Sequence, residues 1–205
     1  MKIAIIGAGN VGRALILRCL KAQHQVLVGV KFPLSEKSIQ LAKEIGEDKL
    51  VPVDEACKLS ELIIVATPAH IVSSLIPHFG DVSNKVIVDA TNAVRIKPEP
   101  YSTAYEGIKK LTGNKSVVKC FNTTGFENLL NPNYGEFAID LFAAGDDSKA
   151  KAKVMKLAIE LGFGACYDFG GDDKVELLEQ FALSWINLAI MQGHGRGIAF
   201  KLLKR

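Results

Sequence analysis

Residues 2–15 read KIAIIGAGNVGRAL, and this stretch decides the fold. An apolar run breaks into a G-x-G-x-x-G pattern at Gly7, Gly9 and Gly12, and a helical pattern of apolar residues follows. Between a strand and a helix, this spacing is the dinucleotide-binding fingerprint. The first glycine permits a tight turn, the second lets the backbone approach a pyrophosphate, and the third lets the helix pack closely on the strand. The helix then directs its free N–H groups and positive dipole end at the phosphates.

Length and composition indicate one globular domain, or one domain with a small appendage. The 205 residues are 48% hydrophobic and 23% charged, which excludes a disordered chain. The 25 basic and 22 acidic residues give a net charge of +3, too balanced to indicate a nucleic-acid-binding protein.

The sequence carries no targeting, membrane or metal signature that we can identify. We find no signal peptide, and the uncharged stretch from Gln180 to Gly195 is shorter than the ~20 apolar residues of a membrane span. The cysteines are scattered without metal-ligand spacing, so we expect a cytoplasmic protein with buried free thiols and no metal site. They are Cys19, Cys57, Cys120 and Cys166.

Strand and helix patterns alternate along the chain. Leu62 to Ala66 are apolar at every position, as expected for a parallel strand covered on both faces. Capping residues predict helix starts at Ser35, Asp54 and 146–148. The rhythm predicts an α/β fold, a doubly wound, mostly parallel Rossmann sheet with a C-terminal helical extension. We expect strands over 2–6, 25–31, 50–53, 62–66, 85–92, 116–122, 138–145 and 165–168, a loop at 131–135, and a last helix over 173–191.

Polar and turn residues follow several of the expected strands. The carboxyl ends of parallel strands form the ligand-binding edge of such a sheet, so we expect these residues to line one site. Asn122 to Gly125 fit equally a local turn or part of a second-substrate pocket. The residues expected to bind the cofactor are Gly7, Ala8, Gly9, Asn10, Val11, Gly12, Val30, Lys31, Lys37, Ala66, Thr67, Pro68, Ala90, Asn92, Asn122 and Thr123.

The end of the second strand indicates which dinucleotide binds. An NAD-binding chain of this fold has Asp or Glu about 20 residues after the glycines, where it holds the ribose 2′-hydroxyl. Here Lys31 stands at that place, with Lys37 close behind, and no carboxylate lies between Gly29 and Phe32. A cation suits a 2′-phosphate, so NADP is favoured over NAD. We therefore expect an NADP-binding domain over 1–170.

We expect no side-chain acid or base in the reaction. Carbonyl reduction normally needs a positioned His, Lys or Tyr that donates a proton to the oxygen. We expect no such proton donor at the ligand edge. His24 and His78 are expected to lie remote from that edge, while His70 and His194 fit local structural or solvent-facing roles. Hydride transfer between two ring cofactors needs only stacking and distance.

Several short motifs recur in the order of a known family. They are 7–12 (GAGNVG), 29–31 (GVK), 66–68 (ATP), 118–123 (VKCFNT), 144–147 (AGDD), 178–179 (LE) and 193–195 (GHG). Together they resemble the NADP oxidoreductases that depend on the deazaflavin coenzyme F420, and the cytosolic domain of the six-transmembrane metalloreductases is similar. Members commonly have a hydroxyl residue where Ala8 and Val30 stand here, and Arg in place of Lys31.

The resemblance covers essentially the whole chain. It implies a homodimeric enzyme that transfers hydride between NADP and F420 or a flavin (FAD or FMN). The alternatives are a small imine or carbonyl reductase of the pyrroline-carboxylate reductase type, and a non-enzymatic module that senses NADP(H).

The C-terminal helix is apolar almost all round. It carries one stripe of apolar residues and further apolar residues on the rest of its surface. Packing against a single neighbour therefore cannot bury all of its apolar surface. We expect one face to pack on its own sheet and the other on a second copy, with 171–205 serving dimerisation and the acceptor pocket. The stripe comprises Leu178, Phe181, Ala182, Trp185 and Leu188.

Overall fold

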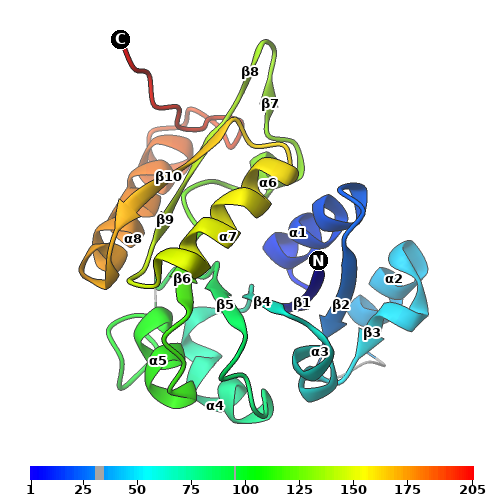
Figure 1. Ribbon diagram of the computed structural model, residues 1–205. Coiled ribbons are helices and arrows are strands. Elements are labelled where there is room, and N and C mark those ends of the chain that lie inside the picture. The colour runs from blue at the N-terminus through cyan, green and yellow to red at the C-terminus, as the bar shows by residue number, and fades with distance from the viewer. Residues whose placement is uncertain (31–34, 95) are drawn as a thin grey trace.

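The computed structural model describes residues 1–30, 35–94 and 96–205, and Figure 1 shows a sheet with helices on both faces. The sheet has eight strands in the order β10-β9-β6-β5-β4-β1-β2-β3. The strands from β3 to β6 run parallel, in the Rossmann order, which confirms the predicted fold. The strands are β1 (Lys2–Ile6), β2 (Gln25–Gly29), β3 (Leu50–Val51), β4 (Leu62–Val65), β5 (Val86–Asp89), β6 (Val117–Lys119), β9 (Asp140–Ala144) and β10 (Ala165–Gly170).

Helices cover both faces of the sheet. One apolar cluster includes residues of α1, α2, α6 and α7, and the cluster on the other face includes residues of α3, α4, α5 and α8. The helices are α1 (Asn10–Lys21), α2 (Glu36–Ile45), α3 (Val53–Leu59), α4 (Val72–Leu75), α5 (Ala104–Thr112), α6 (Phe126–Leu130), α7 (Ser148–Glu160) and α8 (Val175–Ile186). Short helical turns are η1 (Glu47–Lys49), η2 (Ala69–Ile71), η3 (Ile76–His78), η4 (Asp172–Lys174) and η5 (Asn187–Met191).

The central strands are buried on both sides because their residues alternate between the two clusters. In β1, Ile3 and Ile5 belong to one cluster, while Ala4 and Ile6 belong to the other. All four residues of β4 are fully buried. This is the pattern expected where successive side chains of a strand point to opposite, covered faces.

The last two strands of the sheet, β9 and β10, run opposite to the other six. β9 runs antiparallel to β6, and β10 runs parallel to β9. The chain therefore leaves β10 on the side of the sheet where β6 begins, opposite the carboxyl end of β6. Helix α8, orange in Figure 1, follows and packs beside β9.

Two local predictions were wrong. Asp54 is not a helix cap, because α3 begins one residue earlier at Val53 with Pro52 as its N-cap, so Asp54 lies in the first turn. The expected loop at 131–135 contains half of a small hairpin, in which β7 (Asn133–Tyr134) pairs with β8 (Phe137–Ala138). Gly135 makes the hairpin turn possible with a φ of +64°.

Other local predictions are confirmed. The side chains of Ser35 and Asp147 accept backbone N–H bonds at the starts of α2 and α7. The four cysteines are buried free thiols. In the part of the chain that the structure describes, no helix is long and apolar enough to cross a membrane.

Candidate cofactor-binding site

The glycine turn joins β1 to α1 and leaves space above the helix. Gly7 has a φ of +113°, and a Cβ built there would lie 2.6 Å from the Ala66 carbonyl oxygen. Gly9 is the N-cap of α1, and a Cβ built there meets nothing within 4 Å. No side chain caps the helix within the described ranges, so its first N–H groups are free for an anion.

A cavity of about 890 Å³ opens beside this turn. It is lined by the glycine turn, the end of β2, the start of α3 and η3. Its volume suits a nucleotide, since ligand pockets commonly measure about 300–1,000 Å³. The open position at Gly9 and the free helix end therefore fit the pyrophosphate of a dinucleotide, with its adenosine half in the cavity.

The part of this cavity next to the end of β2 is lined by Val30, Ser35, Ser38 and Asp54. Lys31, predicted to bind the 2′-phosphate, lies outside the described residues. Lys37 belongs to α2, but its side chain is also outside what the structure describes.

The histidine predictions held in part. His78 lines the cavity together with Gly7 and Gly9, so the expectation that it lies remote from the ligand edge was wrong. The turn η3 folds back after α4 and brings it there. His24 lies at the opposite edge, where its ring contacts the N-terminal amine at 3.3 Å. His70 and His194 are exposed.

The ends of β5 and β6 place two predicted residues side by side. The Asn92 side chain donates to the Asn122 carbonyl oxygen at 2.8 Å, and the Asn122 side chain donates to Asn92 Oδ1 at 3.0 Å. The Asn122 side chain also donates to the carbonyl oxygen of Leu178 on α8, at 3.3 Å. Thr123, the next residue, is buried.

Three oxygen atoms in the segments just after β4, β5 and β6 are buried without a hydrogen-bond partner among the described residues. They are the hydroxyls of Thr67 and Thr91 and the side-chain oxygen of Asn122. Buried polar atoms are normally satisfied, so a bound polar ligand would supply the missing partners. These residues fit the nicotinamide half of the cofactor, whose carboxamide can both donate and accept.

A charged group that the sequence analysis did not assign lies at the same edge. Lys119 ends β6 and is fully buried. Its Nζ donates to Asp89 Oδ2 at 2.9 Å, to the Thr91 carbonyl oxygen at 2.7 Å and to Glu179 Oε1 at 2.7 Å. Burial lowers the pKa of Lys119, but the two carboxylates outweigh burial and hold this pKa above its ordinary value.

The position of Lys119 corrects one expectation. The ligand edge does hold a lysine, contrary to the sequence-based prediction. All three of its N–H protons are used, however, and the side chain has no exposed surface, so it is not a free proton donor. A lysine in an otherwise apolar strand was the available signal, because a buried charge requires a partner.

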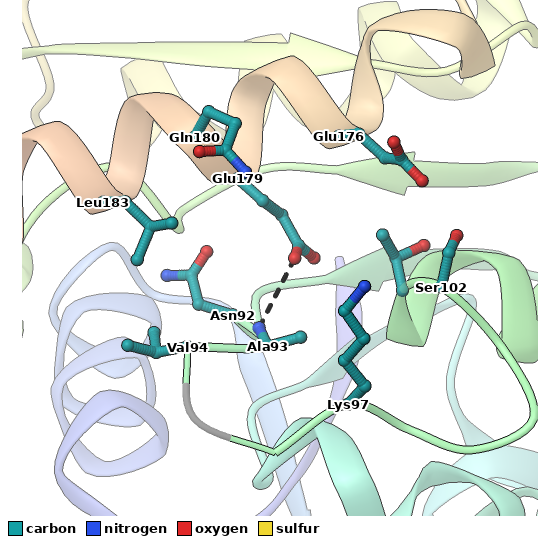
Figure 2. Close-up of a pocket in the computed structure, with 10 residues that line it drawn as sticks. Asn92, Ala93, Val94, Lys97, Ser102, Glu176, Glu179, Gln180 and Leu183 are labelled. Carbon is teal, nitrogen blue, oxygen red and sulfur yellow. Dashed lines mark hydrogen bonds between the residues drawn. The ribbon is translucent and has the colours of Figure 1, made fainter.

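A second, smaller cavity lies between the segment after β5 and helix α8. Its volume is about 120 Å³. Figure 2 shows the side chains of Asn92, Lys97 and Glu179 around it, with the Ala93 amide donating to Glu179 Oε2 at 3.4 Å. Residues of α8 thus form one wall beside the expected nicotinamide end. Within the described ranges, no cluster of three His, Cys, Asp or Glu residues could hold a metal ion.

Comparison with known proteins identifies the family resemblance. Residues 2–93 match the family model described as NADP oxidoreductase, coenzyme F420-dependent. The chain resembles the F420-dependent NADP oxidoreductases. The F420-dependent NADP reductase of Methanocaldococcus jannaschii is 26% identical over 220 residues, covering 97% of each protein. These matches confirm the prediction of an NADP-dependent oxidoreductase.

Other relatives agree with the fold. Human metalloreductase STEAP2 is 25% identical over 78% of this chain, which spans only 32% of that protein. The crystal structure of a putative F420-dependent NADP reductase from Arthrobacter sp. FB24 covers all of both chains with a TM-score of 0.86 and 24% identity. An imine reductase from Myxococcus stipitatus aligns with a TM-score of 0.65 at 19% identity, over 93% of this chain and 61% of that one.

Proposed function

We propose that this protein transfers a hydride between NADP(H) and the deazaflavin coenzyme F420. The observation that carries the proposal is the nature of the nicotinamide end. A cradle for a dinucleotide continues into a pair of carboxamides, Asn92 and Asn122, beside a lysine whose protons are all engaged. Such a site can hold and orient a ring, and the protons of its buried Lys119 are not available to a carbonyl oxygen.

Bound NADPH would supply the hydride. The residues of the chain would supply placement. The free N–H groups of α1 would bind the pyrophosphate, and the buried hydroxyls of Thr67 and Thr91 would bond polar atoms of the nicotinamide half. Hydride transfer between two rings needs no proton transfer. Holding the rings at the right distance and angle can therefore remove much of its activation barrier.

The acceptor would approach from the side of α8. The cavity of about 120 Å³ between the 92–103 segment and α8 opens there. It is smaller than the ~300 Å³ typical of pockets that enclose a ligand. The acceptor ring would therefore lie over this cavity, and a second subunit would complete the enclosure.

The deciding experiment mixes the purified protein with NADPH and F420 and follows oxidation of the nicotinamide. We expect turnover without any added carbonyl or imine, and FMN and FAD are tested in parallel as acceptors. Gly9→Ala is the matched control, because its added methyl group would occupy the expected pyrophosphate position without touching the fold.

Two outcomes would favour the alternatives. Oxidation only in the presence of an imine or carbonyl compound would indicate a small reductase. Tight binding of NADPH without turnover by any acceptor would indicate a sensing module.

A further inference from the structure

Three charged side chains meet away from solvent where β5, β6 and α8 come together. Lys119 and Asp89 have no exposed side-chain surface, and the Glu179 side chain is 12% exposed. The Lys119 ammonium lies 2.9 Å from the Asp89 carboxylate and 2.7 Å from the Glu179 carboxylate. We call these three residues the buried charge cluster.

The formal charges of the buried charge cluster add up to one negative charge, because two carboxylates share one ammonium. In the part of the chain that the structure describes, neither carboxylate has a second cationic partner. Their other oxygens accept backbone amides, Asp89 from Thr91 at 2.9 Å and Glu179 from Ala93 at 3.4 Å. Amide dipoles stabilise the carboxylates without cancelling their charge.

The buried charge cluster lies at the ligand edge of the sheet. Asp89 is the last residue of β5, and Lys119 is the last residue of β6. The unpartnered oxygens of Thr91 and Asn122 belong to the segments that follow these two strands, and both residues are only 3% exposed. This is where the nicotinamide half would bind under the proposed function.

We propose that the buried charge cluster preferentially stabilises the oxidised, positively charged nicotinamide ring and thereby favours hydride donation from NADPH. The inference rests on the proposed function. The ring is neutral when reduced and gains a positive charge when its C4–H bond breaks and the hydride, with both bonding electrons, passes to the two-electron acceptor. A fixed negative charge in a site of low dielectric attracts the cationic ring and not the neutral one.

Glu176 provides a natural comparison on the same helix. It lies one turn before Glu179 and lines the same cavity, as Figure 2 shows. Glu176 is exposed, so solvent and salt screen its charge. If burial gives the cluster its effect, removing the charge of Glu176 changes little.

The test compares the affinities of the oxidised and reduced cofactor by calorimetry. In Glu179→Gln, the Kd for NADP+ should rise about three- to tenfold more than the Kd for NADPH, as removal of one poorly screened charge predicts. Asp89→Asn removes the same formal charge from the other side and should shift the ratio in the same direction. Glu179→Asp should keep a ratio close to that of the wild type, and Glu176→Gln should change it by less than about twofold.

Binding of adenosine 2′,5′-bisphosphate separates this inference from the proposed function. This fragment lacks nicotinamide, so both neutral variants should bind it as the wild type does. If the wild type binds neither NADPH nor NADP+, the proposed function and the inference both fail. If it binds both and neither variant changes the ratio, only the inference is overturned. If one of the two neutral variants no longer binds the bisphosphate, the affinity ratio of the other variant tests the inference. If neither variant binds it, the cluster only maintains the fold and the inference is also overturned.

Discussion

A Cβ atom on Gly12 would lie 1.9 Å from the carbonyl oxygen of Gly7, five residues earlier in the chain. The first turn of α1 is therefore pressed against the end of β1, and no other residue fits at position 12. Gly12→Ala should lower the melting temperature and abolish cofactor binding, because backbone must move to admit the methyl group. Thermal unfolding and titration with NADPH measure the two effects.

Gly9→Ala separates the two roles of the glycine turn. Its methyl group meets nothing within 4 Å, so the protein should unfold at the temperature of the wild type. The affinity for NADPH should nevertheless fall, because the methyl group occupies the approach of the pyrophosphate. Gly197→Ala, which is also in open space, is the control and should change neither property. Unchanged NADPH affinity in Gly9→Ala would contradict the placement of the pyrophosphate.

Lys31 follows β2 in the sequence and is predicted to select NADP over NAD. Lys31→Ala should weaken binding of NADPH by about 1.5–3 kcal/mol, the typical contribution of a hydrogen bond to a charged group, and should leave NADH affinity unchanged. Fluorescence titration with both cofactors measures the difference. Lys43→Ala, on an exposed position of α2, is the control. Equal affinities of the wild type for NADPH and NADH would refute the prediction.

His70 and His194 should be dispensable for the chemical step. Both are exposed, and hydride transfer between rings needs no side-chain acid. His70→Ala and His194→Ala should each lower kcat by much less than the roughly 10²–10⁴-fold that general acid–base catalysis supplies. A loss of that size, with NADPH affinity intact, would show that a proton donor takes part.

Asp147 should make the stability of the protein sensitive to acid. Its carboxylate accepts from the Ser116 hydroxyl and from the backbone of Ala150, which holds the pKa of Asp147 below its ordinary value of 3.8. The stabilisation is complete above the ordinary pKa and is lost as the pH falls through the lower, folded-state pKa. Asp147→Ala should cost about 1 kcal/mol near neutral pH, as loss of an N-cap does.

Denaturant unfolding at several pH values checks the role of Asp147. The difference from the wild type should shrink below pH 3.8. Asp54→Ala is the control, since Asp54 stands in the first turn of α3 without capping it, and its effect should be smaller. A constant difference at every pH would contradict the assignment.

The C-terminal helix should form a dimer interface. Leu178, Ala182 and Trp185 pack within the subunit, whereas Leu177 is 54% exposed and Ile190 is 50% exposed. Apolar area of this kind favours a second copy as the partner. Sedimentation at micromolar concentration should give a dimer, and Ile190→Asp should shift it towards monomer.

Ile159→Asp provides the control for the dimer. Ile159 is an isoleucine of similar exposure, 51%, on α7. This variant should sediment as the wild type does. A wild-type protein that sediments as a 22.2 kDa monomer would refute the dimer.

The sequence allowed the nucleotide half of the fold to be predicted because its signals are local. Each signal determines the structure of only a few neighbouring residues. These signals are the glycine spacing, the fully apolar β4 and the capping residues Ser35 and Asp147. The alternation of strands and helices then predicts a doubly wound, mostly parallel sheet.

The buried charge cluster could not be predicted in the same way. Lys119 and Glu179 are 60 positions apart, and their pairing depends on how α8 packs against the sheet. In the sequence, each of the two is only a charged residue in an apolar stretch. A single sequence does not show which charged residues form ion pairs. His78 was misplaced for a related reason, because only the fold brings η3 back to the glycine turn.

The reversal of β9 determines which end of the last helix lies at the expected nicotinamide end of the site. Because β9 and β10 run against β6, the chain emerges from β10 at the far edge, where the Tyr105 hydroxyl contacts both Asp172 and the carbonyl oxygen at the start of β6. Helix α8 then runs back along the sheet, so that its Glu179 arrives at the last residue of β6. A parallel β9 would have ended at the ligand edge and sent the helix away from it. The direction of β9 thus brings the C-terminal helix to the carboxyl end of β6, where the nicotinamide is expected to bind.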